Sequence, residues 1–134
     1  GKVTVPEKIL GKPGGLDSAE MEQVRGHPAA GKRLIEDVSF LRGAVPHVLY
    51  HHERFDGSGY PESLAGADIP LAGRIVAVAD VFDALTRDRP QRKRVSRDEA
   101  VAYLRENAGK GFDPQVVEAF LAALEAGELK ELAE

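Results

Sequence analysis

The 134-residue chain contains no cysteine, which excludes disulfide bonds and thiolate metal ligands. A metal ion in this protein would therefore be held by histidines and carboxylates. No apolar run approaches the roughly 20 residues that a membrane-spanning helix needs. No charged segment followed by an apolar one opens the sequence as a secretion leader would. We therefore expect no membrane span in this chain and a cytoplasmic location.

The alternation of apolar and polar residues that is typical of β-strands is nearly absent, whereas helical signals are frequent. We predict one all-α domain over residues 1–134, a bundle of about six helices with a long glycine- and proline-rich loop. The helix at 71–85 is apolar on most sides and is expected to be buried. We expect a short turn at 6–10 and a loop at 53–70. A second helix should start at residue 28, with Leu34, Ile35 and Val38 at apolar positions, and a third should cover 40–52 with a bend near Pro46. The other expected helices lie at about 18–26, 71–85, 97–107 and 114–126.

Charge is unevenly distributed along the chain, although the formal net charge is only −4. Because residues 87–94 are strongly basic, the rest of the chain is more acidic still, and we expect no binding of nucleic acid polymers by the whole surface. The basic stretch indicates either a local anion site or a solvated loop. Five basic residues there stand against the single acid Asp88: Arg87, Arg89, Arg92, Lys93 and Arg94.

The segment from His51 to Pro61, HHERFDGSGYP, combines two adjacent histidines with nearby acids and a Gly-X-Gly-Tyr-Pro loop. Imidazoles and carboxylates are the ligand set of a Zn, Fe or Mn site, while glycines and a proline impose an unusual loop shape. An exposed polar turn after a helix is the alternative. The fixed distance between the histidines and the Tyr-Pro pair favours a site.

Three further residues fit a metal centre built on these histidines. His27 lies immediately before Pro28 at a helix start, where its side chain can turn inward, although a capping or core histidine is the alternative. Asp80 lies in the most apolar helix, where a buried carboxylate is costly unless it is paired with a cation such as arginine or bound to a metal. Asp83 shares the face of Asp80 and could accept a hydrogen bond from a ligand histidine.

These motifs resemble the HD-GYP family, metal-dependent phosphodiesterases that hydrolyse the bacterial second messenger cyclic di-GMP. Residues 51–61 match the family signature HHExxDGxGYP at every defined position. The resemblance continues through residues 69–86, 87–94 and 109–121, so that it covers nearly the whole chain. It implies an HD-domain-like helical bundle that acts in signal transduction.

The resemblance also implies a metal centre and a residue that contacts the phosphate. His27, His51, His52 and Asp80 occupy metal-ligand positions of the family, which would hold paired Fe or Mn ions. Such ions would generate hydroxide and polarise the phosphodiester. Lys2 matches the family lysine that follows the His-Asp dyad and contacts the phosphate, so the resemblance implies a catalytic role for it.

Substrate-binding positions follow from the same resemblance. Tyr60 matches the tyrosine of the GYP loop, with a simple loop anchor as the alternative. Arg89 and Arg92 resemble basic positions that hold the phosphates or guanines of cyclic di-GMP, a task that suits the planar guanidinium fork. Gln91 stands where the family often has a tyrosine, and it lacks that ring for stacking.

The chain departs from the family pattern at its start. Gly1 and Lys2 resemble the end of the HDxGK motif, so the His-Asp dyad and further ligands, among them a bridging aspartate, would precede Gly1. This chain contains no such dyad, and its only methionine is Met21. We interpret it as a partial HD-GYP domain, either a piece of a larger protein with an upstream sensor or receiver domain or a truncated homologue. We expect reduced metal occupancy and little catalysis from this chain alone.

Three functions remain open from the sequence. The leading hypothesis is an HD-GYP output domain that hydrolyses cyclic di-GMP through a His/Asp metal centre. The second is a non-catalytic interaction module whose GYP loop binds a partner such as a GGDEF-type diguanylate cyclase. The third is an HD-superfamily phosphohydrolase that acts on another nucleotide.

Overall fold

The computed structural model describes residues 1–88 and 93–129. In these ranges all regular elements are helical, and the only β-type pairing is an isolated bridge between Ala108 and Phe112. The predicted all-α class is therefore confirmed. The elements are η1 (Lys2–Thr4), α1 (Glu7–Leu10), α2 (Ser18–Arg25), α3 (His27–Ile35), η2 (Ser39–Ala44), α4 (Val45–Tyr50), η3 (Gly66–Asp68), α5 (Leu71–Thr86), α6 (Arg97–Glu106) and α7 (Pro114–Glu125), where η marks a 3-10 helix.

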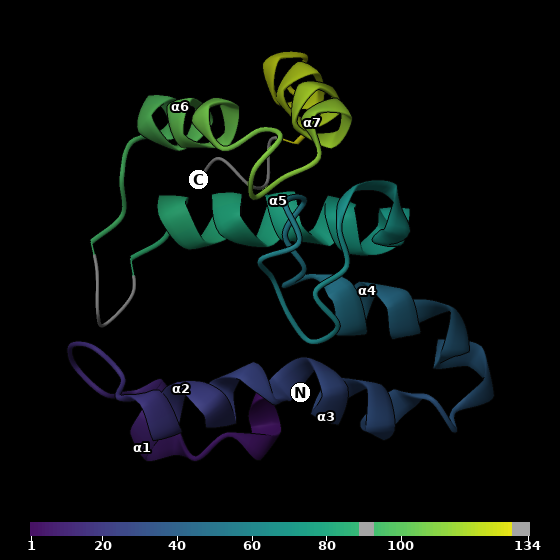
Figure 1. Ribbon diagram of the computed structural model, residues 1–134. Helices are drawn as coiled ribbons and strands as arrows, with labels where there is room; N and C mark the ends of the chain where they lie inside the picture. The colour runs from purple at the N-terminus through teal and green to yellow at the C-terminus, as the bar shows by residue number, and fades with distance from the viewer. Residues whose placement is uncertain (89–92, 130–134) are drawn as a thin grey trace.

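Helix α5 is the centre of the bundle. It runs across the molecule with α6 and α7 on one side and α1 to α4 on the other (Figure 1). Its buried residues Val78 and Phe82 pack with Leu104 of α6 and Leu121 of α7 in one hydrophobic cluster. The predicted burial of this helix holds for those residues, but Ile75 is half exposed, because part of its face is left uncovered by α7.

Side-chain caps explain where three of the described α-helices begin. Asp17 and Ser96 each open a helix with a reciprocal capping box, and the Asp113 side chain accepts a hydrogen bond from the Gln115 backbone at the start of α7. The helix predicted at 40–52 is instead divided at Val45, where η2 gives way to α4. Proline lacks the backbone N–H that a helix interior needs, so Pro46 sits in the first turn of α4 and does not bend a longer helix.

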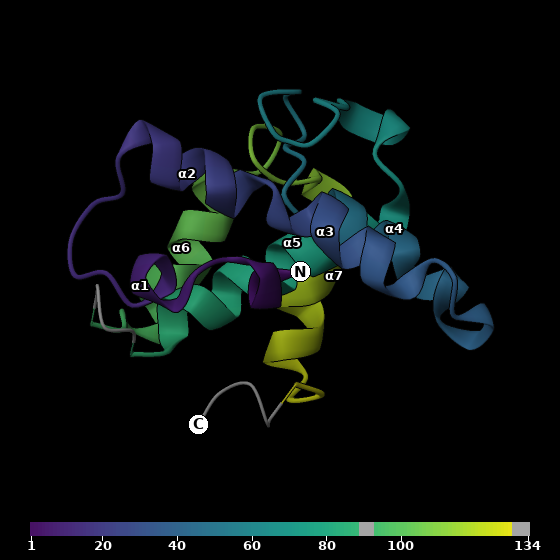
Figure 2. The same ribbon diagram turned by 90° about the horizontal axis from the view of Figure 1, so that it is seen from below.

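The crossing of α3 and α4 requires a glycine. A methyl group on Gly31 would lie 2.6 Å from Cγ1 of Val48, closer than carbon atoms approach in proteins. This close crossing brings the first residue of α3 towards the last turn of α4, and η1 packs beside α3 (Figure 2). The predicted apolar face of this helix is partly wrong: Leu34 is 56% exposed, and Val38 lies beyond its end. Among the described residues, no helix is both long and apolar enough to cross a bilayer.

Candidate metal centre

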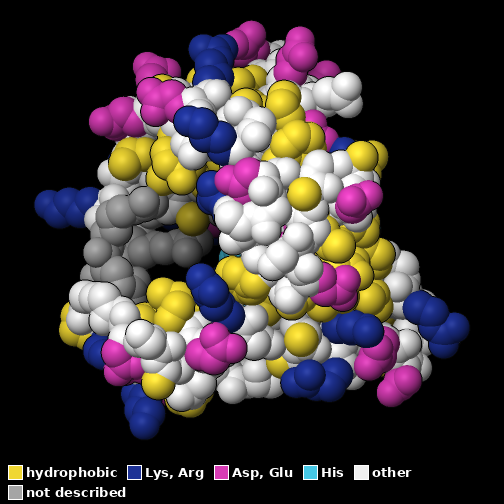
Figure 3. All heavy atoms as spheres, viewed as in Figure 1, with side chains coloured by type: hydrophobic (Ala, Val, Ile, Leu, Met, Phe, Trp, Pro, Cys, Tyr) yellow, Lys and Arg dark blue, Asp and Glu magenta, His cyan; other side chains and the backbone are white. Residues whose placement is uncertain are grey.

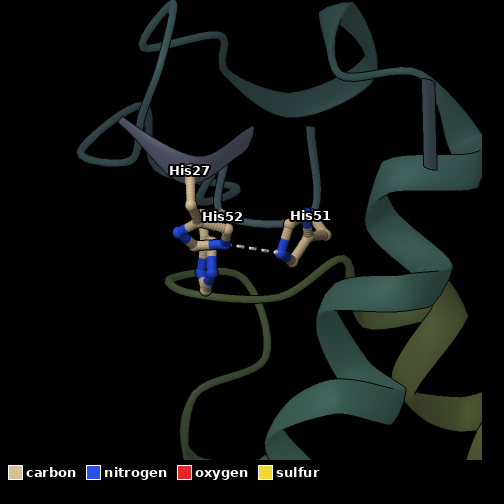
Figure 4. A group of neighbouring side chains, drawn as sticks. All are labelled: His27, His51 and His52. Atoms are coloured by element: carbon tan, nitrogen blue, oxygen red, sulfur yellow. Dashed lines mark hydrogen bonds between the residues drawn. The ribbon is translucent and has the colours of Figure 1, made fainter. Parts of the chain in front are cut away.

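Three histidines from two helix ends meet in the structure. His27 is the first residue of α3, while His51 and His52 follow the last residue of α4. One ring nitrogen from each lies within 4.8 Å of the other two, and the rings point towards one another (Figure 4). The structure thus brings together three of the four residues that the sequence indicated as metal ligands. We call these three residues the histidine cluster.

Backbone carbonyls set the tautomer of two members. Nδ1 of His27 donates to the Val24 carbonyl at 2.6 Å, and Nδ1 of His51 donates to the Val48 carbonyl at 2.9 Å. Because a carbonyl can only accept, the proton of each neutral ring lies on Nδ1 and leaves a lone pair on Nε2. These two Nε2 atoms face each other across 3.4 Å. Two lone pairs repel at that distance, so the arrangement suits a shared cation and fits a divalent transition metal.

The three histidines of the cluster are neutral at pH 7, because their pKa values are lowered. Burial is the main cause that lowers the pKa of all three histidines, and it lowers the pKa of His52 to about 3 with help from the charges of its two neighbours. A neutral imidazole is the form that binds metal. The cluster is therefore in its ligand form at neutral pH without any proton being displaced.

Two more predicted residues border the cluster. Asp80 of α5 is half-buried, and the charge of its carboxylate opposes the lowering of the pKa of His51 and His52. It does not belong to the group of ligand atoms within 4.8 Å of one another. Lys2 of η1 is exposed, and its ammonium charge lowers the pKa of every histidine in the cluster. A carboxylate and an ammonium group therefore act on the cluster from different elements.

In the structure Asp83 pairs with an arginine of its own helix end. Its carboxylate accepts a hydrogen bond from Arg87, one turn later in the sequence, at 2.7 Å. Among the described residues, the acceptors that orient His27 and His51 are the backbone carbonyls, not this aspartate. The carbonyl three residues before each histidine is within reach by local geometry alone, whereas Asp83 has a cation at the favourable i,i+4 spacing.

The GYP-loop tyrosine closes one side of the cluster. The Tyr60 ring stacks on His52 with 5.0 Å between ring centroids and 18° between the planes. The guanidinium carbon of Arg25 lies 5.3 Å from the centroid of the Tyr60 ring. Arg89 and Arg92 lie outside the described residues. On the face shown in Figure 3 the surface is hollowed between α5 and α2, and basic side chains lie at its edge.

Sequence reasoning missed the part that Glu53 plays in this loop. The side chain is only 3% exposed, and its two carboxylate oxygens accept hydrogen bonds from the backbone N–H groups of Glu62 and Leu64 at 2.7 and 3.1 Å. The loop also passes so close to the end of α4 that a methyl group on Gly59 would lie 2.5 Å from the His52 carbonyl oxygen. The glutamate of the motif therefore holds the loop, although its place beside two histidines suggested a ligand.

The chain is similar to several known proteins. A family model described as HD domain matches residues 1–116. The chain is 46% identical over 123 residues to the cyclic di-GMP phosphodiesterase response regulator RpfG of Xanthomonas campestris pv. campestris, a match that covers 90% of this chain and 32% of the relative. It is 46% identical over 125 residues to the cyclic di-GMP phosphodiesterase PA4108 of Pseudomonas aeruginosa, covering 92% and 30%.

A third relative and a solved structure are named for cyclic GMP-AMP and not for cyclic di-GMP. The 3'3'-cGAMP-specific phosphodiesterase 3 of Vibrio cholerae is 39% identical over 124 residues, covering 92% of this chain and 27% of the relative. A crystal structure of a cyclic GMP-AMP specific phosphodiesterase of V. cholerae, V-cGAP3, superposes with a TM-score of 0.71 at 24% identity, covering 89% and 28%. That likeness establishes a shared fold. The chain spans about a third or less of the length of the proteins that it matches.

Proposed function

This chain belongs to the HD domain family, and from that premise we propose that it carries the metal centre of a phosphodiesterase that hydrolyses cyclic di-GMP. The family is the one that the HHExxDGxGYP signature of residues 51–61 indicated. The observation that carries the proposal is the meeting of three neutral histidines directly beside the GYP-loop tyrosine. A metal site next to a substrate-binding loop is the arrangement that phosphodiester hydrolysis needs.

We assign metal-ligand roles to His27, His51, His52 and Asp80, and Fe or Mn as the ions. The opposed Nε2 lone pairs of the first two support this assignment, because a shared cation relieves their repulsion. A bound divalent ion would supply an activated water and neutralise charge on the phosphodiester. The chain's own residues keep the imidazoles unprotonated by partial burial and hold the rings of His27 and His51 through backbone carbonyls.

Substrate contacts are assigned to residues around the cluster. Lys2 is close enough to influence the pKa of all three histidines, so its ammonium is placed to neutralise a phosphate bound there. Tyr60 fixes the His52 ring by stacking and shields it from solvent. Arg89 and Arg92 are assigned to phosphate or guanine recognition on the sequence resemblance.

The choice of cyclic di-GMP rests on similarity. Two relatives named for cyclic di-GMP are 46% identical to this chain, whereas relatives named for 3'3'-cGAMP are 39% to 41% identical. Both molecules are cyclic dinucleotides with two phosphodiesters, so the same metal centre serves either. We therefore propose 3'3'-cGAMP as the second candidate substrate.

The test is hydrolysis by the natural protein that contains this chain, loaded with Mn or Fe(II) and supplied with each cyclic dinucleotide. We expect turnover of cyclic di-GMP that His51→Ala abolishes together with metal content. His47→Ala is the matched control, because His47 is an exposed histidine of α4 that lies outside the cluster. A metal-loaded protein that cleaves neither cyclic dinucleotide would overturn the proposal and favour a module that binds a GGDEF-type partner.

The chain by itself provides an incomplete ligand set in this proposal. It contains no His-Asp dipeptide, and the family resemblance implies that dyad and a bridging aspartate in the ligand set. We propose that the 134 residues alone bind metal more weakly and hydrolyse more slowly than a protein in which the dyad precedes them. Equal turnover by the two forms would show that the dyad is dispensable.

A further inference from the structure

Arg25 contacts the Tyr60 ring, which in turn stacks on His52 of the histidine cluster. Its guanidinium carbon lies 5.3 Å from the centroid of the Tyr60 ring, and that ring stacks on His52 at 5.0 Å between centroids. Arg25 ends α2 and stands two residues before His27, the first residue of α3. An arginine is therefore held one aromatic ring away from the candidate metal centre.

The hydrogen-bonding groups of Arg25 are available to a ligand. The residue is exposed, and among the described residues its only recorded side-chain contact is the one with the Tyr60 ring. A guanidinium group that lies over an aromatic face can direct N–H donors away from the ring to an anion. The contact with the ring also restricts the side chain, so that less conformational freedom is lost when an anion binds.

A cyclic dinucleotide has a second phosphate that the histidine cluster alone does not bind. It carries two phosphodiesters with one negative charge each, and only one of them can lie at the site of cleavage at a time. The other needs a donor a short distance away, and a paired N–H fork is the group that fits two phosphate oxygens best. Arg25 lies over the Tyr60 ring, which itself stacks on His52 of the cluster, so its guanidinium is a short distance from the site of cleavage.

We propose that Arg25 is a substrate-binding residue that holds the second phosphate of the cyclic dinucleotide at the rim of the histidine cluster. The inference rests on the proposed function, since it takes the cyclic dinucleotide as the ligand.

The experiment uses the natural protein that contains this chain. Equilibrium binding of cyclic di-GMP is measured by calorimetry on metal-free protein, so that no turnover occurs, and KM and kcat are measured with Mn. We expect Arg25→Met to weaken binding and raise KM by about tenfold or more, because a charge-assisted hydrogen bond is lost. The value of kcat, the metal content and the thermal unfolding temperature stay close to those of the parent.

Two further variants make the result specific. Arg25→Lys keeps the charge but loses the fork and the stacking, and we expect it to recover only part of the affinity. Arg105→Met is the control, because Arg105 is an exposed arginine of α6 that pairs with Glu125 of α7. Parent-like affinity in Arg25→Met, or a loss of metal content or of folded protein in that variant, would overturn the role of Arg25. If the parent itself binds no cyclic di-GMP, the proposed function is overturned and this role with it.

Discussion

The Nε2 atoms of His27 and His51 face each other across 3.4 Å, although 24 positions separate the two residues in the sequence. Each ring is fixed from behind by a carbonyl one turn earlier in the chain, Val24 for the first and Val48 for the second. The same local device therefore acts at the junction of α2 with α3 and at the end of α4. It fixes the orientation of two imidazoles that could hold a metal ion.

Metal affinity is the direct measure of this preorganisation. We expect His27→Ala to reduce Mn or Fe(II) binding at least tenfold in calorimetric titrations, because one of three convergent imidazoles is removed. His47→Ala should bind like the parent, since that histidine is exposed and lies outside the cluster. Equal losses in the two variants would mean that histidines bind metal nonspecifically at the surface.

The lowered pKa values of the histidine cluster determine how the stability of the fold depends on pH. The folded-state pKa of His52 is about 3, whereas the ordinary value is 6.5. The unfolded state therefore takes up a proton first as the pH falls, and stability is fully present above pH 6.5 and declines below it. The decline due to this histidine is up to about 1.4 kcal/mol per pH unit.

Chemical denaturation of metal-free protein between pH 7.5 and 4.5 measures this slope. The pKa of His27 and of His51 is lowered as well, so the two residues add to the effect. We expect His52→Gln to flatten the curve, because the amide does not titrate. A variant whose stability falls with pH as steeply as that of the parent would show that other groups cause the decline.

Residues whose role depends on local sequence were predictable, and residues whose role depends on distant contacts were not. The helices that follow Asp17 and Ser96 begin where the sequence predicted them, and the motif at His51 predicted a histidine cluster that could hold a metal ion. Glu53 was not recognised as a loop anchor, because its partners are backbone groups nine and eleven residues later. Arg25 meets Tyr60 only because α2 and the GYP loop come together in the fold.

The Glu53 carboxylate should stabilise both the fold and the loop. Glu53→Gln replaces one acceptor by an amide NH₂ group that faces a backbone N–H, so one buried donor loses its partner. We expect the free energy of unfolding to fall by about 1–3 kcal/mol in denaturant titrations. Glu22→Gln provides the control, since Glu22 is an exposed glutamate of α2. Parent-like stability in Glu53→Gln would mean that the loop is held by other contacts.

The α3–α4 crossing gives a prediction that separates packing from chemistry. Gly31→Ala places a methyl group 2.6 Å from Cγ1 of Val48, so the helices must move apart. Because one helix carries His27 and the other leads into His51, metal affinity should fall although no ligand has been changed. Overpacking of this kind typically costs about 1–3 kcal/mol of stability.

A compensating substitution tests this reading of the crossing. Val48→Ala removes the methyl group that Gly31→Ala would meet, so the double variant should regain much of the metal affinity that the single variant loses. The Val48 carbonyl that orients His51 is retained in every variant, because it belongs to the backbone. Calorimetric metal titration of the parent, both single variants and the double variant yields the coupling energy. Additive losses would show that the spacing of α3 and α4 does not control the distance between His27 and His51.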